Sequence, residues 1–223
     1  MKRLIIVVEG QTEEEFVNKT LMPYLISKKV LAVTAIKIRT SKTQKGGLIS
    51  YAHYRRDIIN YLKQDQNVLL TTFIDFFRLP NNFPSYQDCN KLHSVDDKLD
   101  CLEKAIGNDI ANHRFIPYIQ KHEFEALVFA SNNSMEEFIS ILSNTINDAL
   151  EKFNEILEEY PNPEDINGRP QFAPSKRLEQ LFPEYDKVLH GNLIIEDVGI
   201  QTLLRRCSRF NNWVNTLIER CTS

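Results

Sequence analysis

An uninterrupted run of branched apolar residues, Leu4-Ile5-Ile6-Val7-Val8, ends in the pair Glu9-Gly10. A run without polar alternation is typical of a strand buried on both faces, and such strands belong to parallel sheets covered by helices. In open parallel sheets, ligands bind beyond the carboxyl ends of the strands. A carboxylate at that edge needs a cation, a metal or hydrogen-bond donors, because an unpaired buried charge is costly. The run therefore predicts a metal or phosphate site at Glu9.

The next segments repeat this pattern of strands alternating with helices. Strands are expected over residues 31–38, 67–74 and 115–119, and helices over 12–28, 46–63 and 95–107. Thr12 is the expected N-cap of the first helix, with Glu15 at the reciprocal capping-box position. Alternation of this kind implies right-handed crossovers and a parallel sheet.

The second half of the chain has no further strand signal. Helices are expected over residues 134–160 and 196–221, with a short helix between them that Ser175 caps. Trp213 is expected to pack inward. Alternatively, it and the amphipathic tail could form the interface of a homodimer. We therefore expect an α/β domain over residues 1–130, with a four-stranded parallel sheet, and a helical C-terminal extension over residues 131–223.

Composition narrows the class of protein. The chain has 223 residues, enough for one substantial core, and a formal net charge of -3. That charge argues against non-specific coating of DNA, which needs a basic surface. It leaves a nuclease open, because acids that bind divalent cations lower the formal charge.

The cysteines and the start of the chain indicate a cytoplasmic protein. Cys89, Cys101, Cys207 and Cys221 form no CxxC pair, so reduced thiols are the expectation. The apolar run before Glu9 is too short for a signal-peptide core or a membrane span.

Acidic residues follow the ends of three predicted strands: Glu9, then Asp75, then the group His122, Glu123 and Glu125. Because the carboxyl ends of parallel strands share an edge, we expect these side chains to meet. Clustered carboxylates suit Mg²⁺ or Mn²⁺. Two such ions can hold the attacking and leaving oxygens of a phosphodiester in line.

Each acid also has a structural alternative. Glu9 could pair with a lysine or arginine, and Glu13 could simply favour its helix N-terminus. Asp75 could end its strand as a turn former, and His122 could be a hydrogen-bonded structural residue. In extended chain, residues 123 and 125 would share one face, whereas in a helix they would diverge and only one would serve the site.

Basic residues offer candidate phosphate ligands. Lys176 and Arg177 follow a predicted helix start, where backbone amides and cations can hold a phosphate. The alternative is a solvated face. The pairs Arg55-Arg56 and Arg205-Arg206 could steer a nucleic-acid backbone or could be ordinary surface.

The segment Val8-Glu9-Gly10-Gln11-Thr12-Glu13 resembles the VEGxTE signature of Toprim-type catalytic domains, best known from OLD-family nucleases, topoisomerases and primases. The segment 122–127 (HEFEAL), together with residues 163–167, 173–178 and 185–187, is similar to a narrower bacterial Toprim-like family long filed as a domain of unknown function. That family includes the nuclease subunits of PARIS anti-phage systems, whose partner is an ABC-type ATPase. The resemblance spans nearly the whole chain.

The resemblance implies a Toprim fold that binds Mg²⁺ and cleaves phosphodiester bonds, in PARIS systems those of tRNA. By motif match, Glu9 corresponds to the invariant Toprim glutamate, Glu13 to the second acid of VEGxTE, and Asp75 to the first Asp of DxD. The second Asp of DxD is missing, because Phe76 and Phe77 follow. Either the group at residues 122–125 supplies the lost ligands, or the site holds one metal or none.

The resulting hypothesis is a metal-dependent nuclease in which metal-activated water attacks the phosphodiester. Its expected catalytic residues are Glu9, Asp75, His122, Glu123 and Lys176; its expected metal ligands are Glu9, Glu13, Asp75, Glu123 and Glu125; and Lys176 and Arg177 are expected to hold phosphate. The expected partners are a nucleic acid, RNA rather than DNA, and an ABC-type ATPase that controls a latent toxin. The alternatives are a non-catalytic binding or sensing subunit and phosphotransfer on small nucleotides.

Overall fold

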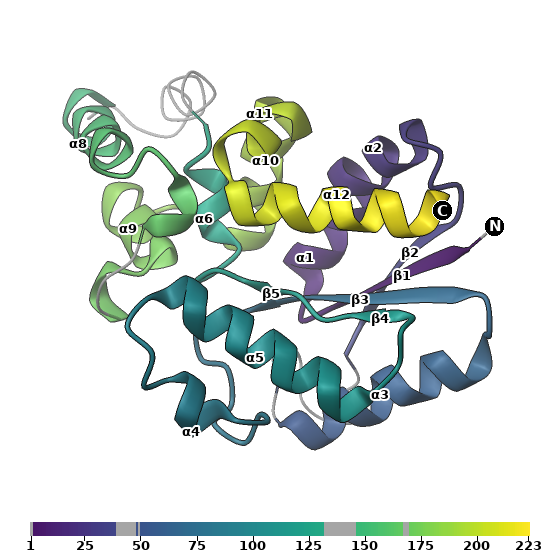
Figure 1. Ribbon diagram of the computed structural model, residues 1–223. Helices are drawn as coiled ribbons and strands as arrows, with labels where there is room; N and C mark the ends of the chain where they lie inside the picture. Colours follow the sequence, from purple (N-terminus) through teal and green to yellow (C-terminus); the bar gives the residue numbers. More distant parts are fainter. Residues whose placement is uncertain (1, 39–47, 49, 132–145, 167–169) are drawn as a thin grey trace. The chain divides into compact units, whose positions relative to one another are not determined.

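The computed structural model describes residues 2–38, 48, 50–131, 146–166 and 170–223 (Figure 1). The chain forms two compact units, which are described separately. Unit 1 comprises Met1–Lys121 and Asn215–Ser223, and unit 2 comprises His122–Val214. The domain boundary at residue 130 that we expect from the sequence stays a prediction.

Unit 1 is built on a parallel sheet, which confirms the predicted α/β fold class. Its strands are β1 (Arg3–Val8), β2 (Val33–Lys37), β3 (Val68–Asp75), β4 (Phe115–Ile116) and β5 (Ile119–Gln120). The order is β2-β1-β3-β4, with β5 also paired to β3, and every pairing is parallel. β1 therefore lies between two strands, and residues 4–8 are all buried, as the apolar run predicted.

The single strand expected over residues 115–119 is instead divided into β4 and β5. Pro117 has no N–H to give to a ladder. The backbone N–H of Tyr118 donates to Thr72 Oγ1 at 3.0 Å, and the same hydroxyl donates to the Tyr118 carbonyl, also at 3.0 Å. A side chain of β3 thus replaces the ladder bonds at the break.

Helices cover both faces of the sheet in unit 1 (Figure 1). On one face, α3 (Tyr51–Gln64) and α5 (Val95–Ile110) bury an apolar cluster with β1 and β3. On the other face lies α1 (Gln11–Phe16), and the ring of Phe16 is 5.6 Å from that of Phe73 in β3. This burial of both sheet faces is the reason the strands lack polar alternation.

The helix expected over residues 12–28 is a succession of α1, a π-helical turn η1 (Val17–Leu21) and α2 (Met22–Ser27). The expected N-cap, Thr12, is wrong: the cap is Gly10, whose N–H donates to Glu13 Oε2 at 2.9 Å. Glu15 instead accepts from the side chain of Gln11. The helix starts earlier than predicted because the chain turns directly after β1.

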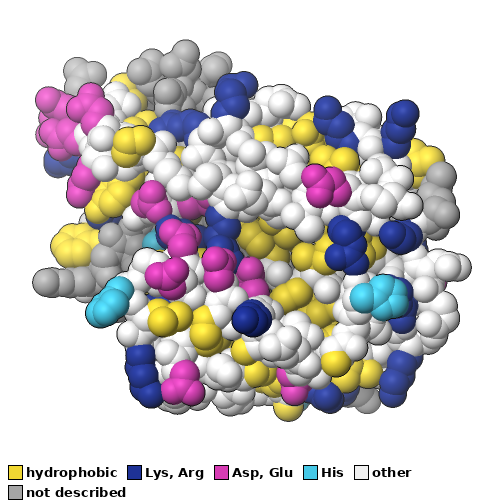
Figure 2. Space-filling model, in the orientation of Figure 1, with side chains coloured by type: hydrophobic (Ala, Val, Ile, Leu, Met, Phe, Trp, Pro, Cys, Tyr) yellow, Lys and Arg dark blue, Asp and Glu magenta, His cyan; other side chains and the backbone are white. Residues whose placement is uncertain are grey.

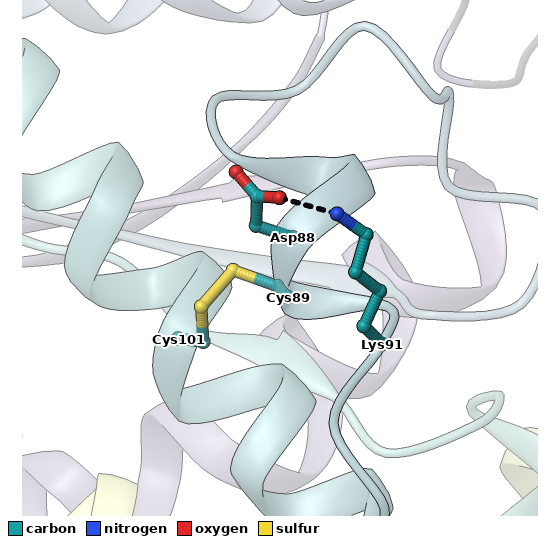
Figure 3. Close-up of a disulfide and its surroundings, with 4 residues drawn as sticks. All are labelled: Asp88, Cys89, Lys91 and Cys101. Atoms are coloured by element: carbon teal, nitrogen blue, oxygen red, sulfur yellow. Dashed lines mark hydrogen bonds and ion pairs between the residues drawn. A yellow bond between two sulfur atoms is a disulfide. The ribbon is translucent and has the colours of Figure 1, made fainter.

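The loop after β3 contains a short helix that the sequence did not predict, α4 (Tyr86–Cys89). Its last residue forms a disulfide with Cys101 of α5, across a Cα–Cα distance of 5.5 Å (Figure 3). The expectation of reduced thiols is therefore wrong for this pair, whereas Cys207 and Cys221 are free. Packing of α4 on α5 brings the two sulfurs together, and no spacing motif announces such packing.

The described residues of unit 2 contain helices and no strand, in agreement with the predicted helical C-terminal region. The α-helices are α6 (Glu125–Val128), α8 (Ile146–Glu159), α9 (Pro174–Leu181), α10 (Asn192–Val198), α11 (Ile200–Arg206) and the start of α12 (Ser208–Thr222). Short turns η2 (Pro163–Asp165), η3 (Pro170–Phe172) and η4 (Lys187–Gly191) connect them. Residues 134–145 of the expected helix 134–160 lie outside the described residues.

Aromatic side chains form the core of unit 2. The rings of Phe129 and Phe153 stack with centroids 5.1 Å apart. Trp213 is buried against Phe210, so it packs inward as expected. Across the described parts of both units, no helix has the length and apolarity that a membrane crossing requires.

Candidate functional site

Three of the predicted site acids lie at the carboxyl end of the sheet in unit 1. Val8 of β1 is level with Phe73 of β3, so Glu9 and Asp75 follow at the ends of adjacent strands. Glu13 projects from the first turn of α1, directly after β1, and is only 4% exposed. The sheet register therefore brings Glu9 and Asp75 to the same edge, as predicted.

Backbone amides satisfy part of these carboxylates. Glu9 Oε1 accepts from the N–H of Leu48 at 3.2 Å, and Glu13 Oε2 accepts from Gly10. Pairing of Glu9 with a lysine or arginine is the structural alternative; Lys121, a lysine of unit 1, forms an ion pair with Asp96 at 2.7 Å. Both Glu9 and Asp75 are partly exposed.

The remaining predicted acids lie in unit 2, where the chain enters α6. His122 is buried and has a left-handed φ of 65°, which is uncommon for a residue other than glycine. Phe124 is already helical, and the Ala126 N–H donates to the Glu123 carbonyl. Of the two alternatives left open by the sequence, the helical one is correct, and the side chains of residues 123 and 125 diverge.

Glu123 binds the first turn of α9. Its two carboxylate oxygens accept from the backbone N–H of Ser175 at 3.0 Å and from the Ser175 hydroxyl at 3.1 Å. The predicted capping role of Ser175 is wrong, because α9 begins at Pro174 with Ala173 as its N-cap. The acid satisfies an amide that has no partner within the helix.

Glu125 is fully buried and points to a different partner. Its Oε2 forms an ion pair with Lys187 Nζ at 3.2 Å, and its Oε1 has no hydrogen-bond partner among the described residues. Burial raises the pKa of Glu125 to about 7; Lys187 opposes this shift and the nearby Glu123 adds to it. This carboxyl therefore changes its protonation state near neutral pH.

Tyr185 completes this buried group. Its hydroxyl is enclosed and has no hydrogen-bond partner in the described part of the chain. Burial, and then the charge of Glu125, raise the pKa of Tyr185 well above its ordinary value. A Cβ on Gly191 would lie 2.8 Å from this hydroxyl oxygen, so the close approach explains the glycine.

The comparisons with known proteins agree with this architecture. Residues 8–218 match the family described as "Domain of unknown function (DUF4276)". The chain belongs to this family. No curated protein matches it.

A solved structure shares the fold of this DUF4276 chain. The C-terminal region of the Burkholderia pseudomallei OLD protein superposes with a TM-score of 0.52 at 12% identity, covering 99% of both chains. The C-terminal region of the Xanthomonas campestris pv. campestris OLD protein gives a TM-score of 0.47 at 15% identity, over 98% of this chain and 97% of that one. The family match confirms the predicted resemblance to a bacterial domain family of unknown function, and the Burkholderia pseudomallei region shows the fold.

The two predicted phosphate ligands of this DUF4276 chain, Lys176 and Arg177, contact other side chains of unit 2. Lys176 forms an ion pair with Glu179, one turn further along α9. The Arg177 guanidinium lies over the rings of Tyr160, at 5.5 Å, and Phe172, at 5.6 Å. Phosphate binding by these two residues stays a prediction.

Whether the candidate acids fit a metal depends on their chemistry and their placement. Carboxylate oxygens are the ligands that Mg²⁺ and Mn²⁺ prefer, so Glu9, Glu13 and Asp75 fit in kind. Among the described residues, however, no three His, Cys, Asp or Glu side chains are gathered closely enough to hold an ion.

Sequence reasoning missed the partners of the unit 2 acids, Ser175 and Lys187, and the neighbouring pair Tyr185 and Gly191. Segments 173–178 and 185–187 carried the family resemblance, yet nothing in them specified a role. The contacts join residues more than fifty positions apart, and no local periodicity reports such pairing.

Proposed function

We propose that this protein is a metal-dependent nuclease of the Toprim type, which hydrolyses phosphodiester bonds in nucleic acid. The observation that carries the proposal is the placement of Glu9 and Asp75 at the carboxyl ends of adjacent parallel strands. Ligands of open parallel sheets bind at this edge. The VEGxTE signature and the fold shared with an OLD protein region support the same conclusion.

Glu9 and Asp75 would hold the cation, Mg²⁺ or Mn²⁺, with Glu13 as an outer ligand. Such a cation, when bound, lowers the pKa of a water molecule and stabilises charge on the phosphoryl oxygens. Glu13 is nearly buried, and the Gly10 N–H holds its Oε2, so its carboxylate is fixed before any ligand arrives. Fixed ligands lose little freedom on binding.

Residues of unit 2 are separate candidates for binding nucleic acid. His122, Glu123 and Glu125 remain candidates from the sequence, but the carboxylates bind α9 and Lys187 respectively. Lys187 is 39% exposed, with its ammonium beside a carboxyl of raised pKa. We take it as a better candidate for binding a phosphate oxygen than Lys176, which pairs with Glu179 on the surface.

The test is cleavage of tRNA, single-stranded RNA, duplex DNA and small nucleotides, with Mg²⁺, Mn²⁺ or a chelator. Glu9→Gln and Asp75→Asn keep the side-chain size and remove the charge, and each should lower cleavage at least about a hundredfold. Glu15→Gln is the matched control, because Glu15 lies on α1 shortly after Glu9 and pairs with Lys19 at the surface. Unchanged cleavage by Glu9→Gln would overturn the proposal.

The biological setting is proposed from the family resemblance. We propose a latent effector of an anti-phage defence system, held or released by an ABC-type ATPase and directed at tRNA. Co-expression with the product of an adjacent ATPase gene, followed by co-purification and tRNA analysis, tests this setting. Toxicity that is identical with and without the ATPase would count against control by that partner.

A second candidate is a non-catalytic binding or sensing subunit. It is favoured by the engagement of the candidate carboxylates with protein donors, Glu9 with Leu48 and Glu123 with Ser175. In that case the acids are structural, and Glu9→Gln would lower the free energy of unfolding while leaving nucleic-acid binding and any cellular toxicity intact. The nuclease proposal predicts the reverse pattern.

A further inference from the structure

The Cys89–Cys101 disulfide closes the loop that follows Asp75. β3 ends at Asp75, and the chain then runs through residues 76–94 to α5. Cys89 is the last residue of α4, and Cys101 lies in α5. The loop also contains two non-glycine residues with left-handed backbone, Arg78 and Ser85. Such conformations persist only where the surroundings hold them.

The disulfide is the covalent tie on α4, beside the packing of Tyr86 and Cys89 on the apolar cluster and a hydrogen bond from Lys98 of α5 to Asn90. The helix has four residues and no side-chain cap at its start, and an isolated single turn is unstable in water. The ion pair between Asp88 and Lys91, drawn beside the disulfide in Figure 3, is about three-quarters exposed and contributes little. The covalent bond and the burial of Phe83 and Cys89 are the main anchors.

The two sulfurs differ in their accessibility. Cys89 is fully buried, whereas Cys101 is partly exposed. Cys101 lines an open pocket of about 550 Å³ within unit 1, whose walls include Pro84, Ser85, Asp100, Lys104 and Asn108. A thiol can therefore approach the Cys101 sulfur and not the other. The Lys104 ammonium on the wall favours an anionic thiolate, while Asp100 opposes it.

We propose that Cys101 is a thiol–disulfide exchange site, at which a dithiol reductant opens the loop between β3 and α5. One thiolate of the reductant attacks Cys101 Sγ, the S–S bond breaks, and Cys89 leaves as a thiolate that takes up a proton. The second thiol of the reductant then attacks the reductant sulfur that is bonded to Cys101 and releases Cys101 as a thiol. The reductant becomes a disulfide, and the protein gains two electrons and two protons.

Opening the bond frees α4 from α5 and loosens the chain directly after Asp75. The exchange itself depends only on the two cysteines and the pocket. Its effect on cleavage rests on the proposed function, since Asp75 is a proposed metal ligand. Because a loosened ligand is less well preorganised, the reduced protein should cleave nucleic acid more slowly than the oxidised one.

The first experiment counts thiols and measures hydrogen exchange in the full chain. Denatured oxidised protein should show two thiols, those of Cys207 and Cys221, and four after treatment with dithiothreitol. Reduction should speed amide exchange in residues 76–94 by about tenfold or more. Unchanged exchange in this segment, or four thiols in air-oxidised protein, would overturn the proposal.

The second experiment separates the two sulfurs. Cys89→Ser leaves a thiol at the pocket and Cys101→Ser leaves a buried one, so with glutathione disulfide the first variant should form a mixed disulfide at least about tenfold faster. Cys221→Ser is the control and should retain the Cys89–Cys101 disulfide. Equal rates for the two variants would contradict exchange at Cys101. If the chain proves not to cleave nucleic acid, these thiol and exchange results still decide the proposal.

Discussion

Glu164 and Glu123 have the same role at the residue scale, since each binds the first turn of a distant helix. Glu164 is fully buried, and its oxygens accept from the N–H groups of Arg209 at 2.7 Å and Phe210 at 3.1 Å, at the start of α12. The first amides of a helix lack internal partners and carry partial positive charge. A carboxylate from another segment therefore stabilises the helix and fixes its position within unit 2.

Replacing Glu164 tests this role. Glu164→Gln should lower the free energy of unfolding by about 1–3 kcal/mol, because the amide nitrogen cannot accept a bond from the helix and a charged acceptor is lost. Urea denaturation provides the measurement. The control is Glu158→Gln, which replaces an acidic residue of α8. Equal loss in both variants would argue against a specific capping bond.

The raised pKa of Glu125 makes a prediction about pH. The folded-state pKa is about 7, above the ordinary 4.5, so folding favours the protonated acid. That stabilisation is complete below pH 4.5 and is lost as pH rises through 7, by about 1–3 kcal/mol in all. In Glu125→Gln this loss should vanish. Urea unfolding of chelator-treated protein should therefore show a smaller decline in the free energy of unfolding from pH 5 to 8 than the wild type shows. Parallel curves would contradict the shift.

At the scale of elements, the packing of η4 against α6 depends on the absence of a side chain at Gly191. Gly191→Ala should destabilise unit 2 by about 1–3 kcal/mol, because the new methyl group would collide with the Tyr185 hydroxyl. Tyr185→Phe should be neutral or stabilising, since that buried hydroxyl has no hydrogen-bond partner among the described residues.

The double variant should recover most of the stability lost by Gly191→Ala. Thermal unfolding of the wild type, the two single variants and the double variant forms a double-mutant cycle. Simple addition of the two single effects would show that the hydroxyl is not the obstacle.

The sequence predicted those elements whose signal lies in a continuous stretch. β1 and β3 were placed correctly because each is an apolar run with an acid at its end. The division between β4 and β5 depends on the hydroxyl of Thr72, forty-six residues before Tyr118. α4 likewise depends on its contact with α5. Tertiary contacts of this kind leave no local pattern.

The same distinction applies to the candidate site. Strand order alone brought Glu9 and Asp75 to one edge, so they could be predicted from the sequence. The directions of Glu123 and Glu125 depend on the left-handed backbone at His122, and no spacing rule indicates such a conformation. Lys187 was missed because its partner lies sixty-two residues away.

At the scale of the molecule, the charges are unevenly distributed. Acidic side chains gather over α8 (Figure 2), where Asp148, Glu151, Glu155, Glu158 and Glu159 outnumber the single basic residue, Lys152. A phosphate backbone is repelled by such a face. If the protein is a nuclease, its substrate should therefore avoid α8.

Neutralising this face tests where nucleic acid binds. The triple variant Glu151→Gln, Glu155→Gln and Glu158→Gln should bind nucleic acid equally or about two- to fivefold more tightly at low salt, because repulsion is removed. Binding measured by fluorescence anisotropy, repeated at high salt, should show the difference disappear. Weaker binding by the variant would place α8 in the interface.

The course of α12 limits how this protein can be divided. The helix begins in unit 2 and its last residues belong to unit 1, where the Arg220 carbonyl accepts from Lys2 and its guanidinium donates to His113. A fragment that stops at residue 130 would leave those bonds unmade and expose the surface they cover. Dissection experiments should therefore supply residues 215–223 as a separate peptide or through a permuted chain. Only then can a failure of the isolated half be attributed to its candidate site.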